Sequence, residues 1–245
     1  MARLAESTNQ HIIPRIQVDD TTPEADGLGC APRRVDSRAR IAIAAKSVSE
    51  NPKIPGTIFT AAAEIEAAGG KALALACDIR FDDQVEAAMQ KTVETFGGVD
   101  ILINNASAID LRGIDKLDMK RFDLMHQVNA RGSFMVSKLA VPYLKAAENP
   151  HILMLSPPLD LKEKWFAAYT AYSIAKYGMS LAVLGLAGEL RRAGIAVNAL
   201  WPRTTIDTEA IRLIAGQQAR RHARHPAIMA DAASGRISLG TLPSF

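Results

Sequence analysis

Ile101-Leu102-Ile103-Asn104-Asn105-Ala106-Ser107 is an apolar run that ends in polar and small residues. Three aliphatic residues followed by two asparagines predict a buried strand that runs into a turn. The segments on both sides of this strand decide which kind of sheet it belongs to.

Strands and helices alternate along the chain on both sides of this run. Strands are predicted at residues 41–45, 72–77, 99–103, 151–155 and 195–200. Apolar residues at helical spacing predict helices that begin near Ile58 and Val85, and longer ones over residues 119–147 and 168–193. Gly69-Gly70 and Gly97-Gly98 are expected to end the first two helices, and Pro142 to bend the third. This alternation predicts an α/β fold, a Rossmann-like doubly wound parallel sheet in a single domain with helices on both faces.

The composition suits one globular domain. The chain has 245 residues, of which 48% are hydrophobic and 22% are charged. Cys30 and Cys77 give neither a disulfide framework nor a metal-binding spacing, so no metal is expected. The sequence contains no apolar run of membrane-spanning length and no secretory signal near its start, so we expect a cytoplasmic location without a membrane span.

The charge pattern gives no support to a nucleic-acid partner. The net charge is only +3. The basic run Arg220-Arg221-His222-Ala223-Arg224-His225 is more typical of a solvated helix face, because aromatic residues are not interleaved with the basic ones.

Tyr172 and Lys176 lie four positions apart in a segment predicted as helix, which places a phenol and an ammonium on one face. The positive charge of Lys176 is expected to lower the pKa of Tyr172 and bring it toward the range of general acid–base catalysis. Proton transfer to a carbonyl oxygen is half of a ketone reduction. The other half is a hydride, which side chains cannot supply, so a nicotinamide cofactor is implied if the pair is catalytic.

Two further polar residues occupy suggestive places in this pattern. Ser156 follows the predicted strand 151–155, and ligands of open α/β sheets bind at the carboxyl ends of strands. Asn129 lies within the long predicted helix. Each has a structural alternative, since Ser156 would also serve as a loop cap and Asn129 would also bond to nearby backbone.

Together, Asn104-Asn105-Ala106, Asn129, Ser156 and the Tyr172/Lys176 pair resemble the short-chain dehydrogenase/reductase family, over about residues 41–233. The sequence segments around Ser156, Tyr172 and Pro202 are similar to those of the family's hydroxysteroid dehydrogenase-like branch. The resemblance implies that Tyr172 transfers the proton and that Lys176 lowers the tyrosine pKa and binds the nicotinamide ribose. It also implies that Ser156 orients the reacting oxygen and that Asn129 holds a water leading to solvent.

The resemblance also implies residues that contact the cofactor. Besides Tyr172 and Lys176 they are Lys46, Asp78, Asn104, Ala106, Pro202 and Thr204. The strand at 41–45 is followed by Lys46 and lacks a terminal acid, which favours NADP(H) over NAD(H). The alternatives are a solvated lysine for Lys46, a helix cap or turn for Asp78, and a plain strand-to-helix turn for Asn104 and Ala106.

The two ends of the chain depart from the family. Members open with a strand and a glycine-rich turn that holds the cofactor pyrophosphate, but residues 1–40 offer only Gly27-Leu28-Gly29. Pro14 interrupts the apolar run 12–18, which argues against a central strand there. We expect residues 1–40 to form an atypical N-terminal segment, disordered or frameshifted, with an atypical first βα unit. Residues 234–245 are expected to form an atypical tail.

Two functions follow from this sequence. The first is an oxidoreductase that transfers a hydride between NADP(H) and a hydrophobic ketone or secondary alcohol, since Trp165 and Phe166 lie in a loop expected near the substrate. The alternative is a non-catalytic remnant that cannot bind cofactor and has an association role. In either case, homo-oligomers would form through the long helices.

Overall fold

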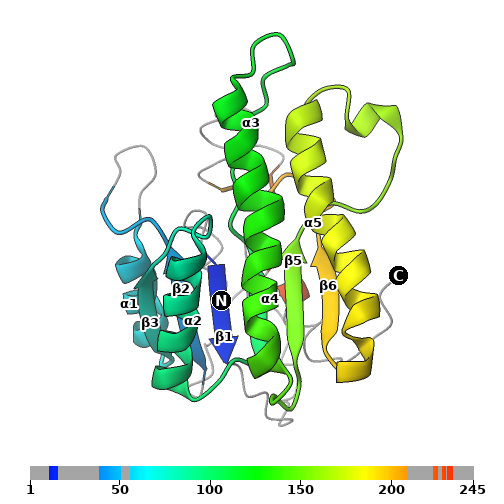
Figure 1. Ribbon diagram of the computed structural model, residues 1–245. Helices are drawn as coiled ribbons and strands as arrows, with labels where there is room; N and C mark the ends of the chain where they lie inside the picture. The colour runs from blue at the N-terminus through cyan, green and yellow to red at the C-terminus, as the bar shows by residue number, and fades with distance from the viewer. Residues whose placement is uncertain are drawn as a thin grey trace, which may run out of the picture.

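The computed structural model describes residues 11–15, 39–50, 56–208, 223–225, 228–229 and 231–233. Their central sheet has six strands in the order β3-β2-β1-β4-β5-β6 (Figure 1). The strands are β1 (His11–Arg15), β2 (Arg40–Ala45), β3 (Lys71–Ala76), β4 (Ile101–Asn104), β5 (His151–Leu155) and β6 (Ala196–Leu200). This is the strand order of a doubly wound dinucleotide-binding sheet, and it confirms the predicted Rossmann-like fold.

Strand β1 differs from the other described strands in its direction. β2 is parallel to β3, and β4 to β6 are parallel to one another, but β1 runs antiparallel to both of its neighbours. The prediction that Pro14 keeps this segment out of the centre of the sheet is wrong. An empty position between β2 and β4 would leave backbone groups of both strands unpaired, at about 1–3 kcal/mol for each buried group, and this outweighs the one donor that a proline lacks.

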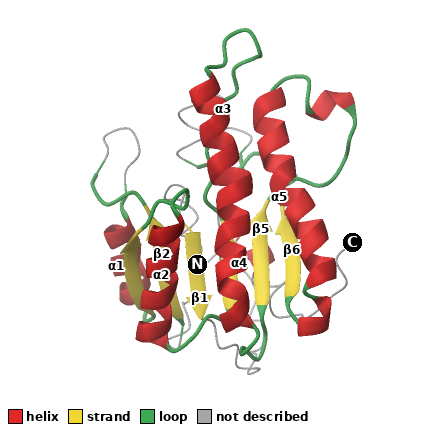
Figure 2. Ribbon diagram, in the orientation of Figure 1, coloured by secondary structure: helices red, strands yellow, loops and turns green. Residues whose placement is uncertain are grey.

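Helices cover both faces of the sheet, as the alternation predicted. They are α1 (Ile58–Ala67), α2 (Asp82–Phe96), α3 (Met119–Met125), α4 (Ser133–Leu144) and α5 (Thr170–Glu189), with the π-helix η1 (His126–Gly132) and the 3-10 turns η2 (Glu163–Trp165) and η3 (Arg191–Ala193). Figure 2 shows α2, α4 and α5 in front of the strands, and buried residues of these helices form one cluster with Ala42 and Ala44 of β2. On the opposite face, α1 packs on Ile41 and Ile43 because successive residues of a strand face opposite sides.

The glycine pairs end the first two helices as predicted. Gly69 follows α1 with a φ of 97°. Gly97 follows α2 with a φ of 84°, and its N–H donates to the carbonyl oxygen of Val93 at 2.7 Å. Glycine adopts this left-handed conformation without steric cost. None of the described helices is long and apolar enough to cross a membrane.

The long predicted helix is formed by α3, η1 and α4 in direct succession. Pro142 lies inside α4, and the irregular turn comes earlier, at η1. Gly132 ends this wide turn close to the loop after β3, where an added Cβ would lie 2.5 Å from Cδ1 of Ile79. Single π-helical turns of this kind are frequent at functional sites, and η1 contains Asn129.

Candidate active site

A cavity of about 430 Å³ lies at the carboxyl ends of β5 and β6. It brings together Ser156, Tyr172 and Lys176, which the sequence predicted as partners. The remaining lining residues are Asn105, Leu155, Pro157, Pro158, Ser173, Leu200, Trp201, Pro202, Ile206, Thr208 and Met229. Three chemically active side chains thus meet beside a largely apolar wall.

Ser156 is the first residue after β5 and is only 2% exposed. Its hydroxyl has no hydrogen-bond partner among the described residues. Leaving a buried hydroxyl unpaired costs about 1–3 kcal/mol, so few are left in folded proteins without a reason. A ligand oxygen in the cavity would satisfy it.

Tyr172 lies in the first turn of α5. Burial raises the pKa of its phenol, because the charged form is disfavoured, and the neighbouring Ser107 hydroxyl opposes this rise. The expected lowering by Lys176 is therefore not what this structure shows. The phenol is held in its neutral form, which is the form that donates a proton.

Lys176 follows one turn later on the same face, with its ammonium drawn toward the end of β5. Its Nζ donates to the carbonyl oxygen of Leu155 at 2.5 Å and lies 3.3 Å from Sδ of Met179. Burial lowers its pKa from 10.5 to about 8, so the amine is mostly protonated at neutral pH. These two contacts leave one of its three N–H donors without a partner among the described residues.

Asn129 is fully buried in η1, and its side chain holds the loop that follows β4. Its Oδ1 accepts from the N–H of Ala108 at 2.7 Å, and its Nδ2 donates to the carbonyl oxygen of Ala108 at 2.9 Å. The alternative prediction, a hydrogen bond between the Asn129 side chain and the backbone, therefore agrees with the structure. The backbone partner, Ala108, lies 21 residues away in sequence. The implied water contact stays a prediction.

Three side chains of α5 fasten the loop between β5 and α5, which the sequence did not predict. Tyr177 donates to the carbonyl oxygen of Asp160, and Ser180 to that of Pro157, each at 2.6 Å. Ser173 donates to the carbonyl oxygen of Trp165 at 2.8 Å. The segment after Ser156 is thereby tied to the helix that carries Tyr172 and Lys176.

The aromatic pair expected near the substrate lies elsewhere in this loop. Trp165 is 51% exposed and donates from Nε1 to the carboxylate of Asp160 at 2.8 Å. The ring of Phe166 packs on that of Tyr177 with centroids 4.5 Å apart. Neither residue lines the described cavity, where Trp201 supplies the indole instead.

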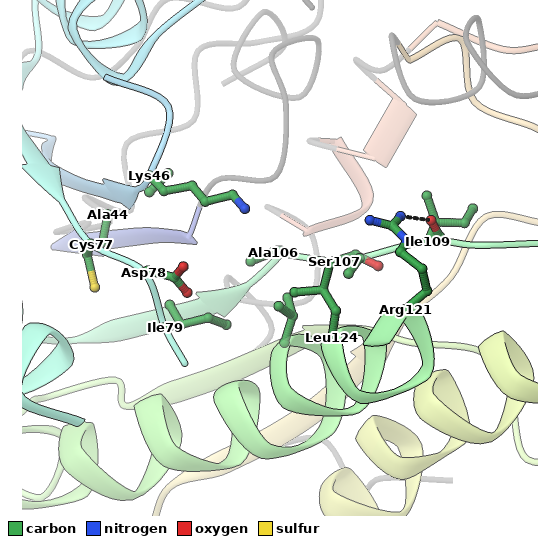
Figure 3. Close-up of a pocket in the computed structure, with 13 residues that line it drawn as sticks. Ala44, Lys46, Cys77, Asp78, Ile79, Ala106, Ser107, Ile109, Arg121 and Leu124 are labelled. Carbon is green, nitrogen blue, oxygen red and sulfur yellow. Dashed lines mark hydrogen bonds between the residues drawn. The ribbon is translucent and has the colours of Figure 1, made fainter. Parts of the chain in front are cut away.

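A second cavity, of about 210 Å³, lies at the carboxyl ends of β2, β3 and β4 (Figure 3). Three predicted cofactor residues, Lys46, Asp78 and Ala106, line it. The other lining residues are Ala44, Ala45, Cys77, Ile79, Ser107, Ala108, Ile109, Arg121, Leu124 and Val128. Asp78 bonds Arg80 at 2.6 Å, and this hydrogen bond holds the pKa of the carboxyl below its usual range.

The remaining predicted cofactor residues are distributed differently. Pro202 lines the larger cavity, whereas Thr204 is exposed and lies outside the linings of both described cavities. Asn104 is fully buried, and its Nδ2 donates to Oγ of Ser137 at 3.0 Å, so its side chain belongs to the core. The next residue, Asn105, lines the larger cavity, as expected when alternate residues of a strand face opposite sides. Arg121 also lines the smaller cavity, and no sequence pattern predicted it as a site residue.

The described residues fit both ends of a nicotinamide dinucleotide but not its middle. Ser156 and Lys176 keep hydrogen-bonding capacity in one cavity, and Lys46 and Asp78 line the other. In a dinucleotide-binding fold the glycine-rich turn follows the first strand, which would end between the two cavities. Here, β1 begins at this edge, with His11 opposite Ala44, and ends at the other edge. Among the described residues no such turn stands here, and Gly27-Leu28-Gly29 lies outside them.

Comparison with known proteins agrees with this geometry. A family model described as enoyl-(acyl carrier protein) reductase matches residues 43–235. Hydroxysteroid dehydrogenase-like protein 2 of Danio rerio is 53% identical over 207 residues, which is 84% of this chain and 50% of that protein. The Homo sapiens protein of the same name is 49% identical over 207 residues, with 84% and 49% covered. The chain thus spans about half the length of the curated relatives it matches.

Solved structures give the same result. A putative dehydrogenase from Xanthomonas campestris is 55% identical with a TM-score of 0.81, and the match covers 85% of this chain and 77% of that one. A short chain dehydrogenase from Mycobacterium thermoresistibile is 52% identical with a TM-score of 0.76, covering 81% and 71%. With the family model matched over most of the domain, this chain belongs to the short-chain dehydrogenase/reductase family of oxidoreductases.

Proposed function

We propose that this chain transfers a hydride between NADP(H) and a hydrophobic ketone or secondary alcohol. The observation that carries the proposal is the meeting of Ser156, Tyr172 and Lys176 in one cavity. The family relationship supports it over the alternative of a non-catalytic remnant. A nicotinamide bound here would supply the hydride, which no side chain of the cavity can provide.

Each of the three side chains has a role that its surroundings suit. Tyr172, kept neutral by burial, donates its proton to the carbonyl oxygen in reduction and takes it back from the alcohol in oxidation. The unpaired hydroxyl of Ser156 donates a hydrogen bond to the same oxygen and stabilises the negative charge that develops there. The ammonium of Lys176 stabilises the Tyr172 phenolate that remains after proton transfer. Its third N–H donates a hydrogen bond to a ribose hydroxyl.

Asn129 would hold a water that connects Lys176 with solvent. Its side-chain amide is engaged with Ala108, so a backbone group of η1 would make this contact. Ser107 lies on the same loop, and its hydroxyl opposes the rise in the Tyr172 pKa, which supports a role for this loop beside the proton donor.

The preference for NADP(H) rests on the smaller cavity. Lys46 follows β2 directly, and no acid stands at the end of that strand. A cation at this position suits a 2′-phosphate, whereas an acid would accept hydrogen bonds from an unmodified ribose. Asp78 would contact the adenosine. Backbone groups of Asn104 and Ala106 would contact the ribose region, and Pro202 and Thr204 would contact the carboxamide.

The apolar wall of the larger cavity supports a hydrophobic substrate. Aliphatic or proline side chains from β5, β6 and the segments after them form most of it, and Trp201 adds an indole. These apolar residues are Leu155, Pro157, Pro158, Leu200, Ile206 and Met229. An apolar carbonyl compound gains by leaving water here, at about 25 cal/mol per Å² buried.

We also propose that the chain works in the cytoplasm and as a homo-oligomer through its long helices. Phe134 of α4 and Leu181 and Leu184 of α5 are large apolar residues left exposed. A second copy would cover them. Sedimentation of the purified chain should show a dimer or larger species, and Leu181→Glu should shift it to monomer; a monomeric wild type would refute the proposal.

The direct test is turnover. Oxidation of NADPH is followed by absorbance with a panel of apolar ketones, for the wild type and for Tyr172→Phe. The wild type should reduce at least one ketone, and the variant should lose roughly 10²–10⁴-fold in kcat because it lacks the proton donor. Equal turnover by both proteins would remove Tyr172 from the mechanism.

A further inference from the structure

We propose that Ser107 is a further catalytic residue, whose hydroxyl donates a hydrogen bond to the phenol oxygen of Tyr172 when Tyr172 gives up its proton. The inference rests on the proposed function, because that function makes Tyr172 the proton donor. Ser107 directly follows Asn104-Asn105-Ala106, and the sequence resemblance gave it no role. It therefore adds a residue to the set of Ser156, Tyr172 and Lys176.

The hydroxyl of Ser107 is buried and unpaired. Ser107 lines the smaller cavity (Figure 3), but its Oγ is shielded from solvent and has no hydrogen-bond partner among the described residues. Ser156, in the larger cavity, is in the same condition. A buried hydroxyl without a partner destabilises the folded state, so few are kept unless another group uses them. Ser107 therefore requires a partner, as Ser156 does.

The phenol of Tyr172 is the partner that the structure offers. The Ser107 hydroxyl lies close enough to the phenol to oppose the rise in pKa that burial causes, so it favours the phenolate form. The two groups make no aligned hydrogen bond in the structure, where burial keeps the phenol neutral. A donor that bonds the phenolate but not the phenol stabilises the transition state more than the ground state. Only interactions of that kind accelerate the chemical step.

The π-helix η1 braces both sides of this contact. Asn129 of η1 accepts from the N–H of Ala108, directly after Ser107, at 2.7 Å and donates to the carbonyl oxygen of Ala108 at 2.9 Å. The next residue of η1, Ala130, packs on α5, where a Cβ added to Gly178 would lie 2.9 Å from its Cβ. The loop with the hydroxyl and the helix with the phenol are thus held by one element. A donor that is fixed in advance needs no reorganisation when charge develops.

The step balances atoms and electrons. In reduction, the carbonyl carbon accepts the hydride, and the carbonyl oxygen takes the proton of Tyr172. The O–H bond of Tyr172 breaks, and its electron pair stays on the phenol oxygen. The O–H of Ser107 donates to this oxygen, while the ammonium of Lys176 stabilises it from the next turn of α5. Ser107 keeps its own proton throughout, so it acts as a hydrogen-bond donor and not as an acid.

The test is the pKa of Tyr172 in the full chain, measured by ¹⁹F NMR after 3-fluorotyrosine has replaced the four tyrosines. Fluorine lowers the pKa of a phenol and brings the titration toward the pH range in which the chain stays folded. The Tyr172 signal is the one that Tyr172→Phe lacks. Ser107→Ala should raise this pKa by roughly one unit, because a hydrogen bond to a charged group is lost. Ser107→Thr keeps the hydroxyl and should stay close to wild type.

Ser133→Ala is the matched control. Ser133, the first residue of α4, also has a fully buried and unpaired hydroxyl, and it is not among the groups that shift the pKa of Tyr172. An unchanged Tyr172 pKa in Ser107→Ala would overturn the inference. An equal rise in Ser133→Ala would also overturn it, because the cause would then be a general change in packing.

Turnover distinguishes this inference from the oxidoreductase proposal. In a chain that reduces a ketone, Ser107→Ala should lower kcat roughly tenfold and leave KM for the ketone nearly unchanged, because the lost bond forms in the transition state. A wild-type kcat in this variant would count against the inference. A Tyr172 pKa that depends on Ser107 in a chain without turnover rejects the oxidoreductase alone, whereas turnover with an unchanged Tyr172 pKa rejects the role of Ser107 alone.

Discussion

The hydroxyl of Tyr177 donates a 2.6 Å hydrogen bond to the carbonyl oxygen of Asp160, and this bond joins α5 to the loop that follows Ser156. Tyr177 is adjacent to Lys176, so one turn of helix both carries the ammonium and anchors the wall of the cavity. The position of the Ser156 hydroxyl relative to Tyr172 therefore depends on contacts outside the cavity.

Removing this hydroxyl should affect turnover more than folding. Tyr177→Phe keeps the ring contact with Phe166 and loses one hydrogen bond, so we expect a loss of about 0.5–1.5 kcal/mol in unfolding free energy. Because the loop is loosened, kcat should fall while NADPH affinity is kept. Tyr143→Phe, in α4 and away from the loop, is the control. Wild-type kcat in Tyr177→Phe would show that the anchor is only structural.

The charge of Lys176 should set an upper pH limit for activity. Its folded pKa is lowered to about 8, so the ammonium is present below that pH and is lost as the pH rises through it. We expect kcat/KM measured on the free enzyme to fall above pH about 8. Lys176→Arg should retain charge and abolish this decline, whatever its residual rate, because arginine stays protonated. A profile that stays flat to pH about 10 would contradict the role given to the ammonium.

His151 should make the fold sensitive to acid. It is fully buried at the start of β5, and neither ring nitrogen has a hydrogen-bond partner among the described residues. Burial lowers its pKa from 6.5, so below that pH the unfolded chain binds a proton that the folded chain resists. Stability is therefore lost as the pH falls below 6.5, by at most about 1.4 kcal/mol per pH unit from this group.

Urea unfolding at a series of pH values from about 7 to about 5 measures this slope. His151→Leu should flatten it relative to wild type. If both proteins lose stability equally with acid, carboxylates elsewhere account for the effect and His151 does not.

Gly132 should not tolerate a methyl group. An added Cβ would lie 2.5 Å from Cδ1 of Ile79 and 3.0 Å from the carbonyl oxygen of Gln127, so Gly132→Ala should cost about 1–3 kcal/mol of unfolding free energy. Gly188→Ala is the matched control, because nothing lies within 4 Å of its Cβ and alanine favours helix by about 1 kcal/mol. Adding Ile79→Val to Gly132→Ala should recover part of the loss. A neutral Gly132→Ala would mean that η1 shifts freely.

The sequence was sufficient for the parts of this molecule that depend on local pattern. Strands such as Arg40–Ala45 and helices ended by Gly69 or Gly97 follow from apolar spacing and from glycine conformation. The meeting of Ser156 with Tyr172 and Lys176 also followed, because strand ends and helix faces have a fixed relationship in this fold.

Features that depend on distant partners were not predictable in the same way. Strand β1 occupies the position between β2 and β4 and runs antiparallel to both, and its own short apolar run indicates neither feature. Asn104 and Asn105 look equivalent in sequence, but strand geometry sends one to the core and the other to the cavity. Helical spacing placed Lys176 near Tyr172 but did not show that its ammonium bonds the carbonyl oxygen of Leu155.

We propose that the two cavities together bind a nicotinamide dinucleotide although β1 is reversed. Titration of the purified chain with NADPH, and with NADH for comparison, measures this directly by calorimetry or nicotinamide fluorescence. We predict micromolar binding of NADPH and weaker binding of NADH. A folded chain that binds neither nucleotide would contradict the account and would identify the intact set of Ser156, Tyr172 and Lys176 as an inherited but idle site.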